Sequence, residues 1–106
     1  MKVLIAGCGD VGSVLAIALL ADGHIVYGLK RNVSTLPAGV RPIQADLTKP
    51  ETLRDLPGNI DTLVFMPTPA SRDKAGYESI FIEGWKNVWA GLKSKPARSL
   101  VVSSTA

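Results

Sequence analysis

Three glycines near the amino terminus have the spacing of a nucleotide-binding turn. Gly7, Gly9 and Gly12 follow an apolar run and precede a segment with helical periodicity. The first glycine would allow a tight turn after a strand, the second a close approach to a diphosphate, and the third close packing of the helix. A helix beginning at Asp10 and Val11 would add free N–H groups and a positive dipole end. These five residues predict a dinucleotide site, and a tight turn without a ligand is the alternative.

A second group of residues bears on which dinucleotide would bind. An NAD site usually has Asp or Glu at the end of the second strand, where the carboxylate accepts hydrogen bonds from the ribose. This sequence has Lys30, Arg31 and Asn32 there. Arg31 could clamp a 2′-phosphate with its planar guanidinium, and Lys30 could act as a point charge. The residues favour NADP(H), with NAD(H) left open, and the alternative is that both cations are solvated loop residues.

The rest of the chain predicts the elements that position these residues. Apolar runs indicate strands at residues 2–6, 25–29, 41–45, 61–66 and 99–103, and helical periodicity indicates helices at 10–21 and 74–93. Thr48 and Glu51 form a capping box that predicts a short helix to about Leu56.

The alternation of strands and helices predicts the fold class. It is α/β, a Rossmann-like doubly wound parallel sheet with strand order 3-2-1-4-5, truncated after strand five. A ligand would bind across the carboxyl ends of strands one and four. Three other features have ordinary structural interpretations. Cys8 is a small residue in a tight turn, and His24 is a loop residue. The aromatic residues of the last predicted helix are core residues.

Composition and charge narrow the function classes. The chain of 106 residues is 46% hydrophobic and 20% charged, with a formal net charge of +3. No apolar stretch approaches the roughly 20 residues of a membrane span, and no basic stripe interleaved with aromatic residues indicates nucleic-acid binding. A signal peptide is not recognisable, and a single cysteine suits a reducing compartment. We therefore expect a cytoplasmic protein without membrane or nucleic-acid partners.

Length predicts a piece of a larger protein. Complete dinucleotide-binding domains commonly carry about six strands, and the last strand expected here is followed only by a short polar turn that leaves it uncovered. We expect residues 1–106 to form one NAD(P)-binding domain. It would be the amino-terminal fragment of a protein whose substrate-binding part lies elsewhere.

Several segments resemble the NAD-dependent epimerase/dehydratase family, which comprises extended or atypical short-chain dehydrogenases/reductases. The segments are residues 3–12, 23–26, 45–48 and 101–105, and the resemblance is to the branch of nucleoside-diphosphate-sugar epimerase-like proteins. It implies that Asp46 and Leu47 flank the adenine, with Asp46 reaching its amino group. It also implies that a further segment runs beside the nicotinamide ribose, namely Met66, Pro67 and Thr68.

The resemblance also assigns a candidate catalytic residue, Ser104. A hydroxyl at this place hydrogen-bonds the substrate carbonyl or alcohol, while a tyrosinate exchanges the proton and a nearby lysine favours the tyrosinate. The Tyr-x-x-x-Lys pair is not in these residues, because neither Tyr27 nor Tyr77 has a lysine four positions later. A plain polar residue ending a strand is the alternative for Ser104.

Together these features predict the cofactor-binding portion of an NADP(H)-dependent oxidoreductase or nucleotide-sugar epimerase/dehydratase. It would act by reversible hydride transfer on a small carbonyl-bearing substrate, and the resemblance implies a homodimer. Two alternatives stay open: a dinucleotide-sensing regulatory protein without turnover, and a stand-alone nucleotide-binding module that pairs its fifth strand with another copy. No metal is expected.

Overall fold

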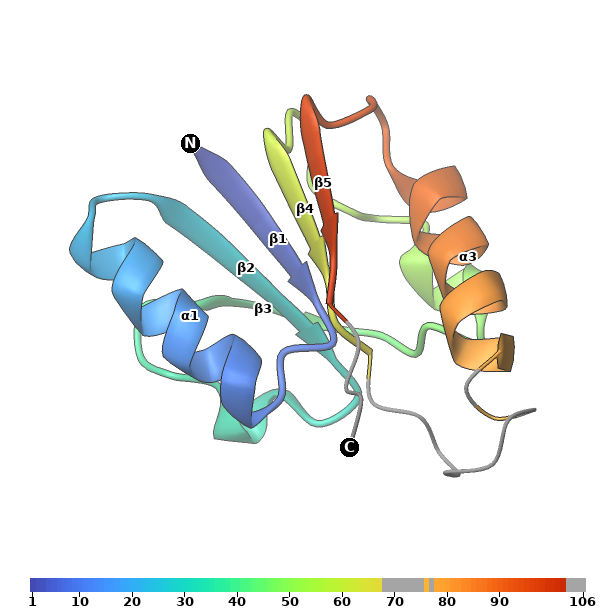
Figure 1. The fold of residues 1–106 in the computed structure, drawn as a ribbon, viewed down its shortest axis with the longest axis horizontal. Coiled ribbons are helices and arrows are strands. Elements are labelled where there is room, and N and C mark those ends of the chain that lie inside the picture. The colour runs from blue at the N-terminus through green and yellow to red at the C-terminus, as the bar shows by residue number, and fades with distance from the viewer. Residues whose placement is uncertain (68–75, 77, 103–106) are drawn as a thin grey trace.

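A parallel sheet of five strands forms the centre of the molecule (Figure 1). The computed structural model describes residues 1–67, 76 and 78–102. The strands are β1 (Lys2–Ala6), β2 (Ile25–Lys30), β3 (Arg41–Gln44), β4 (Thr62–Phe65) and β5 (Arg98–Val101). Every neighbouring pair is parallel, and the order is β3-β2-β1-β4-β5. The predicted fold class and strand order are confirmed.

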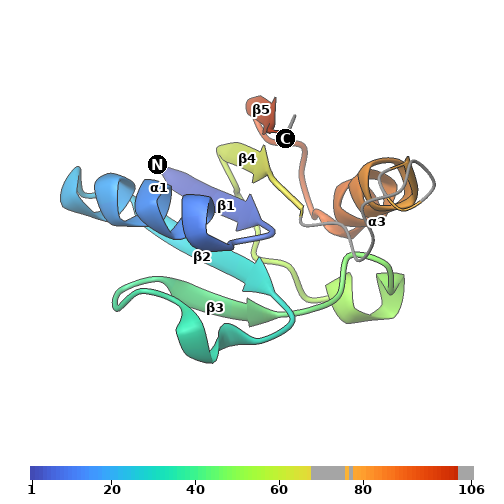
Figure 2. The ribbon, with the colours of Figure 1, turned by 60° about the horizontal axis from the view of Figure 1, so that its bottom comes forward.

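Helices cover both faces of this sheet. Figures 1 and 2 show α1 (Asp10–Ala21) on one face and α3 (Gly84–Gly91) on the other. The first predicted helix has the bounds of α1. The second differs, because a π-helical turn, η3 (Ser79–Glu83), precedes α3. Two short 3₁₀ turns, η1 (Val33–Thr35) and η2 (Pro50–Leu53), follow β2 and β3.

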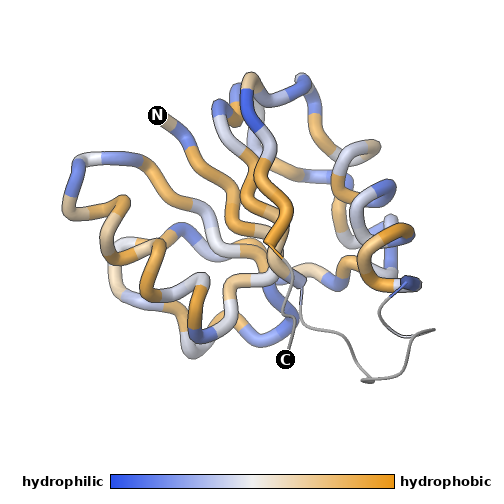
Figure 3. The backbone as a smooth tube through the Cα atoms, viewed as in Figure 1, coloured by the Kyte–Doolittle hydropathy of each residue, from blue (hydrophilic) through white to orange (hydrophobic). Residues whose placement is uncertain are grey.

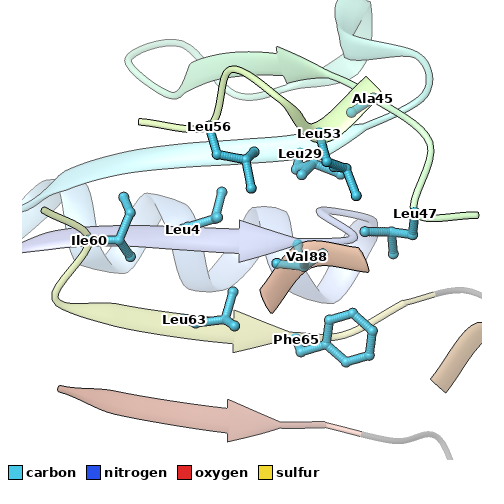
Figure 4. Close-up of a cluster of buried hydrophobic side chains, with 11 residues drawn as sticks. Leu4, Leu29, Ala45, Leu47, Leu53, Leu56, Ile60, Leu63, Phe65 and Val88 are labelled. Carbon is cyan, nitrogen blue, oxygen red and sulfur yellow. The ribbon is translucent and has the colours of Figure 1, made fainter. Parts of the chain in front are cut away.

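Two hydrophobic cores lie on the two faces, because successive strand residues point to opposite sides. Under α3, a cluster that includes Leu4, Leu63 and Phe65 packs on Val88 (Figure 4). Under α1, the alternating strand residues form a second cluster with Ala16. The central strands are hydrophobic along most of their length (Figure 3), as buried parallel strands should be.

The aromatic residues of the η3–α3 segment belong to the core, as predicted. The ring of Phe65 meets Phe81 edge-on at a centroid distance of 6.0 Å and Trp85 at 5.5 Å. Trp85 in turn stacks on Trp89. These contacts fix α3 over the end of β4.

The predicted capping box is wrong. The Thr48 hydroxyl donates to Asp46 Oδ1 at 2.6 Å instead of capping a helix. The turn η2 begins after Lys49 with no side-chain cap and spans only 4 residues. The reason is local competition, since a threonine hydroxyl prefers a carboxylate two residues away to a more distant backbone N–H.

Candidate functional site

The turn between β1 and α1 requires a glycine at its first position. Gly7 has a φ of +93°, and a Cβ there would lie 2.5 Å from the carbonyl oxygen of Met66. At Gly12, a Cβ would lie 3.3 Å from Ile5 Cγ2. The turn and the start of α1 therefore lie as close to β1 and the end of β4 as the backbone allows.

The amino end of α1 offers unpaired N–H groups. The first hydrogen bond of the helix runs from Ser13 N to Gly9 O at 2.8 Å, and no side chain caps the end. Among the described residues, nothing accepts a hydrogen bond from the N–H groups of Asp10, Val11 or Gly12. Such free donors at the positive end of a helix dipole favour a bound anion.

The end of β2 and the loop that follows it carry two cations, Lys30 and Arg31, and no carboxylate. Lys30 Nζ donates to Thr35 Oγ1 at 2.9 Å, which orients the ammonium group. Asn32 Oδ1 accepts from the N–H of Ser34 at 3.1 Å and from its hydroxyl at 2.6 Å. Arg31 is exposed. The loop is therefore tied internally, while the guanidinium of Arg31 faces solvent.

Strand β3 also supports this loop. Ala45 N donates to Lys30 O at 3.2 Å as the last backbone bond between β2 and β3. The side chain of Gln44 then donates from Nε2 to the carbonyl oxygen of Arg31, also at 3.2 Å. The backbone of Arg31 is thereby fixed one residue beyond the end of the sheet.

A carboxylate stands at the end of β3. Asp46 Oδ1 accepts from the N–H of Thr48 at 2.9 Å as well as from its hydroxyl. These two bonds, aided by the charges of Arg31 and Lys49, hold the pKa of the Asp46 carboxyl below its ordinary value, against a smaller opposing effect of burial. Thr52 Oγ1 accepts from the N–H of Asp46 at 3.0 Å. Asp46 is thus an oriented carboxylate that stays charged near neutral pH.

A pocket of about 330 Å³ joins these strand ends. It brings together seven of the residues that the sequence predicts for cofactor binding: Gly7, Gly9, Lys30, Arg31, Asn32, Asp46 and Leu47. Four further residues complete its lining: Leu29, Ala45, Thr48 and Ile80. The lining thus combines two cations, one carboxylate, several apolar side chains and the glycine turn.

The other predicted residues do not line this pocket. Asp10 and Val11 are exposed at the start of α1, and Gly12 is buried behind it. Met66 and Pro67 follow β4 and lie against Gly7. Thr68 and Ser104 lie outside the described residues.

The position of the pocket differs from the predicted crevice between β1 and β4. It lies over the carboxyl ends of β1, β2 and β3. The backbone of Met66 and Pro67 lies against Gly7 on the β4 side of the turn. Among the described residues, this pocket lies on the β2 side of the turn.

Ile80 is the lining residue that sequence reasoning missed most clearly. It lies in η3, and its helical spacing indicated a core position. The structure places it partly in the core and partly in the pocket wall. No motif marks such a residue, because its role depends on how η3 packs. Leu29, Ala45 and Thr48 could have been found as direct neighbours of predicted residues.

Neither Cys8 nor His24 lines this pocket. Burial raises the pKa of the Cys8 thiol, against the opposing effects of a hydrogen bond with Ser13 and the charge of Lys30. His24 Nδ1 lies 3.3 Å from the amino group of Met1, at the opposite end of the sheet. Within the described residues, no group of His, Cys, Asp and Glu could hold a metal ion, and no helix is long and apolar enough to cross a bilayer.

Solved structures share this fold. A protein from Methylobacillus flagellatus, described as an NAD-dependent epimerase/dehydratase, is 38% identical, with a TM-score of 0.74 over 98% of this chain and 37% of its own. A protein from Burkholderia cenocepacia, described as an epimerase, is 24% identical, with a TM-score of 0.73 over 98% of this chain and 37% of its own. The UDP-glucose 4-epimerase of Thermus thermophilus, solved in complex with NAD, is 24% identical, with a TM-score of 0.69 over 86% of this chain and 33% of its own.

The chain therefore spans 33–37% of the length of these relatives. No protein-family model matches the sequence, and no curated protein matches it. The structural matches confirm the resemblance to the NAD-dependent epimerase/dehydratase family and the Rossmann-like fold.

Proposed function

The chain is similar, over nearly its whole length, to part of an NAD-dependent epimerase/dehydratase, and from this premise we propose that it binds NADP(H). The observation that carries the proposal is the shared pocket. Lys30 and Arg31 line the same pocket as Gly7 and Gly9. A 2′-phosphate and a diphosphate belong to the same half of NADP(H), so one bound molecule would engage both ends of this pocket.

The residues present fit such a ligand. A diphosphate would lie at Gly7 and Gly9, within the positive field of the α1 N–H groups. The 2′-phosphate would lie beside Arg31 and Lys30, whose charges complement it. The adenine would occupy the apolar end, with Asp46 accepting a hydrogen bond from its amino group.

The charges argue for the phosphorylated cofactor. Asp46 is the only carboxylate among the residues that line the described pocket, and its Oδ1 is already engaged by Thr48. No carboxylate stands at the end of β2 to bind the ribose 2′-hydroxyl of NAD(H) or repel a 2′-phosphate. Arg31 is the residue that we assign to phosphate recognition, with Lys30 and Asn32 beside it.

Calorimetric titration with NADPH and NADH tests this preference. We expect NADPH to bind about tenfold more tightly, since a charge-assisted contact contributes on the order of 1.5–3 kcal/mol. Arg31→Ala should weaken NADPH binding about tenfold and leave NADH binding within about twofold of the original. Arg54→Ala is the matched control, since Arg54 is exposed and outside the pocket lining. Tighter binding of NADH by the unmodified chain would contradict the proposal.

The proposal extends to the protein in which this domain acts. The bound cofactor supplies a hydride donor or acceptor, and the substrate is a small carbonyl or alcohol compound such as a nucleotide sugar. Met66, Pro67 and Thr68 would lie beside the nicotinamide ribose, and Ser104 would hydrogen-bond the substrate oxygen. A reducing compartment such as the cytoplasm suits the unpaired, buried Cys8.

A further inference from the structure

Two residues of α3, Gly84 and Asn87, contact the pocket residue Leu47. Ile80 of η3 lines the same pocket. A Cβ on Gly84 would lie 3.4 Å from Leu47 Cβ, so the helix backbone passes very close to that side chain. Asn87 Nδ2 donates to the carbonyl oxygen of Leu47 at 2.7 Å. Gly84 and Asn87 are three residues apart on α3 and so lie on one face of that helix, and this face packs on Leu47.

The hydrogen bond from Asn87 holds a peptide group that also contacts Asp46. The carbonyl of Leu47 and the N–H of Thr48 belong to the same planar peptide unit. Asn87 holds its oxygen, and its N–H donates to Asp46 Oδ1 at 2.9 Å. Because the unit is rigid, fixing the direction of the carbonyl also fixes the direction of the N–H, and with it one oxygen of the carboxylate.

The second oxygen of that carboxylate is available to a ligand. Among the described residues, every hydrogen bond to the Asp46 side chain goes to Oδ1. Oδ2 can therefore accept from an N–H group in the pocket. Its direction depends on Thr48, and the direction of the Thr48 N–H depends on Asn87.

We propose that Asn87 is a positioning residue that orients the Asp46 carboxylate, through the Leu47–Thr48 peptide, to select the 6-amino group of adenine. This inference rests on the proposed function, since it concerns the base of the dinucleotide bound in the same pocket. It assigns base selectivity to a residue on α3, 40 positions from the loop that it orients.

The test compares NADPH with its hypoxanthine analogue, in which a carbonyl oxygen replaces the amino group. That oxygen cannot donate to Asp46 and is repelled by it, so the unmodified chain should prefer NADPH by about tenfold. Asn87→Asp keeps the size of the side chain but removes the donor to Leu47. We expect it to reduce the preference to within about twofold, chiefly by weakening NADPH binding.

The ratio of the two dissociation constants separates positioning from general loss of structure, because unfolding would weaken both ligands equally. Asn59→Asp, the same change at an exposed site at the other end of the sheet, should leave the ratio unchanged. Asp46→Ala should abolish the preference, and adding Asn87→Asp to it should reduce the ratio no further. Asn87→Ala replaces Asn87→Asp if the aspartate prevents folding.

The possible outcomes distinguish the inference about Asn87 from the proposed binding of NADP(H). Loss of the preference in the Asn87 variant alone, with the control intact, supports the inference. A preference retained by the Asn87 variant, or missing from the unmodified chain, overturns the inference and leaves cofactor binding standing. If the unmodified chain binds neither dinucleotide, the proposed function fails and the inference fails with it.

Discussion

At the scale of single residues, three positions define the proposed site. Gly7 adopts a positive φ and lies against Met66, Arg31 lines the same pocket as the glycine turn, and Asp46 is an oriented carboxylate with a lowered pKa. The sequence predicts all three from local motifs or resemblance. The hydrogen bonds that orient Asp46 were not predictable, because Thr48 could equally have capped a helix.

Gly7→Ala should destabilise the fold more than Gly23→Ala. Both glycines have positive φ, +93° and +83°, but a Cβ at Gly23 meets nothing within 4 Å. We expect Gly23→Ala to lower the free energy of unfolding by about 1 kcal/mol, from the backbone conformation alone. Gly7→Ala should lower it by about 3 kcal/mol, because the methyl group also collides with Met66. Urea unfolding measures both, and equal losses would show that the turn does not press against the end of β4.

The Asp46–Thr48 interaction should stabilise the protein in a pH-dependent way. The pKa of Asp46 is lowered in the folded state, so the interaction contributes fully above the ordinary Asp value, roughly 3.9, and its contribution is lost as pH falls through the folded value. Thr48→Val removes the hydroxyl donor. The difference in unfolding free energy between the two chains should therefore be larger at pH 7 than at pH 3, and a difference that grew toward acid pH would contradict this account.

At the scale of elements, local signals predict most of the fold. Strand β1, the glycine turn and α1 are read directly from apolar and glycine patterns, and Gly23 ends α1 through bonds from Gly23 N to Leu20 O and from His24 N to Leu19 O. The placement of Ile80 and Asn87 could not be read in this way. Both depend on how α3 packs across the sheet, and no sequence pattern encodes a contact between residues 47 and 87.

Gly91 in α3 provides a test of that packing. A Cβ at this position would overlap the carbonyl oxygen of Leu53 in η2. Alanine favours a helix over glycine by about 1 kcal/mol, so an unconstrained helix would gain stability from Gly91→Ala. We expect a net loss of about 1–2 kcal/mol in thermal or urea unfolding, because α3 must move away from η2. A stabilised variant would mean that α3 is not held against η2.

At the scale of the whole molecule, the parallel sheet gathers the site at one end. The carboxyl ends of β1, β2 and β3 meet there, so three loops far apart in the sequence line one pocket. Among the described residues, the opposite end holds a more open hollow around Met1, Asn59 and Asp61. A net charge of +3 agrees with an anionic ligand but does not locate it; the arrangement of loops does.

The most direct test of the central claim is a map of amide chemical shifts in the ¹⁵N-labelled chain during titration with NADPH. We expect the amide shifts to change most at the glycine turn, at Lys30–Asn32 and at Asp46–Leu47, while those of Asn59 and Asp61 stay unchanged. Shifts centred on the opposite end of the sheet, or no shifts at millimolar NADPH, would contradict the claim that this pocket binds a dinucleotide.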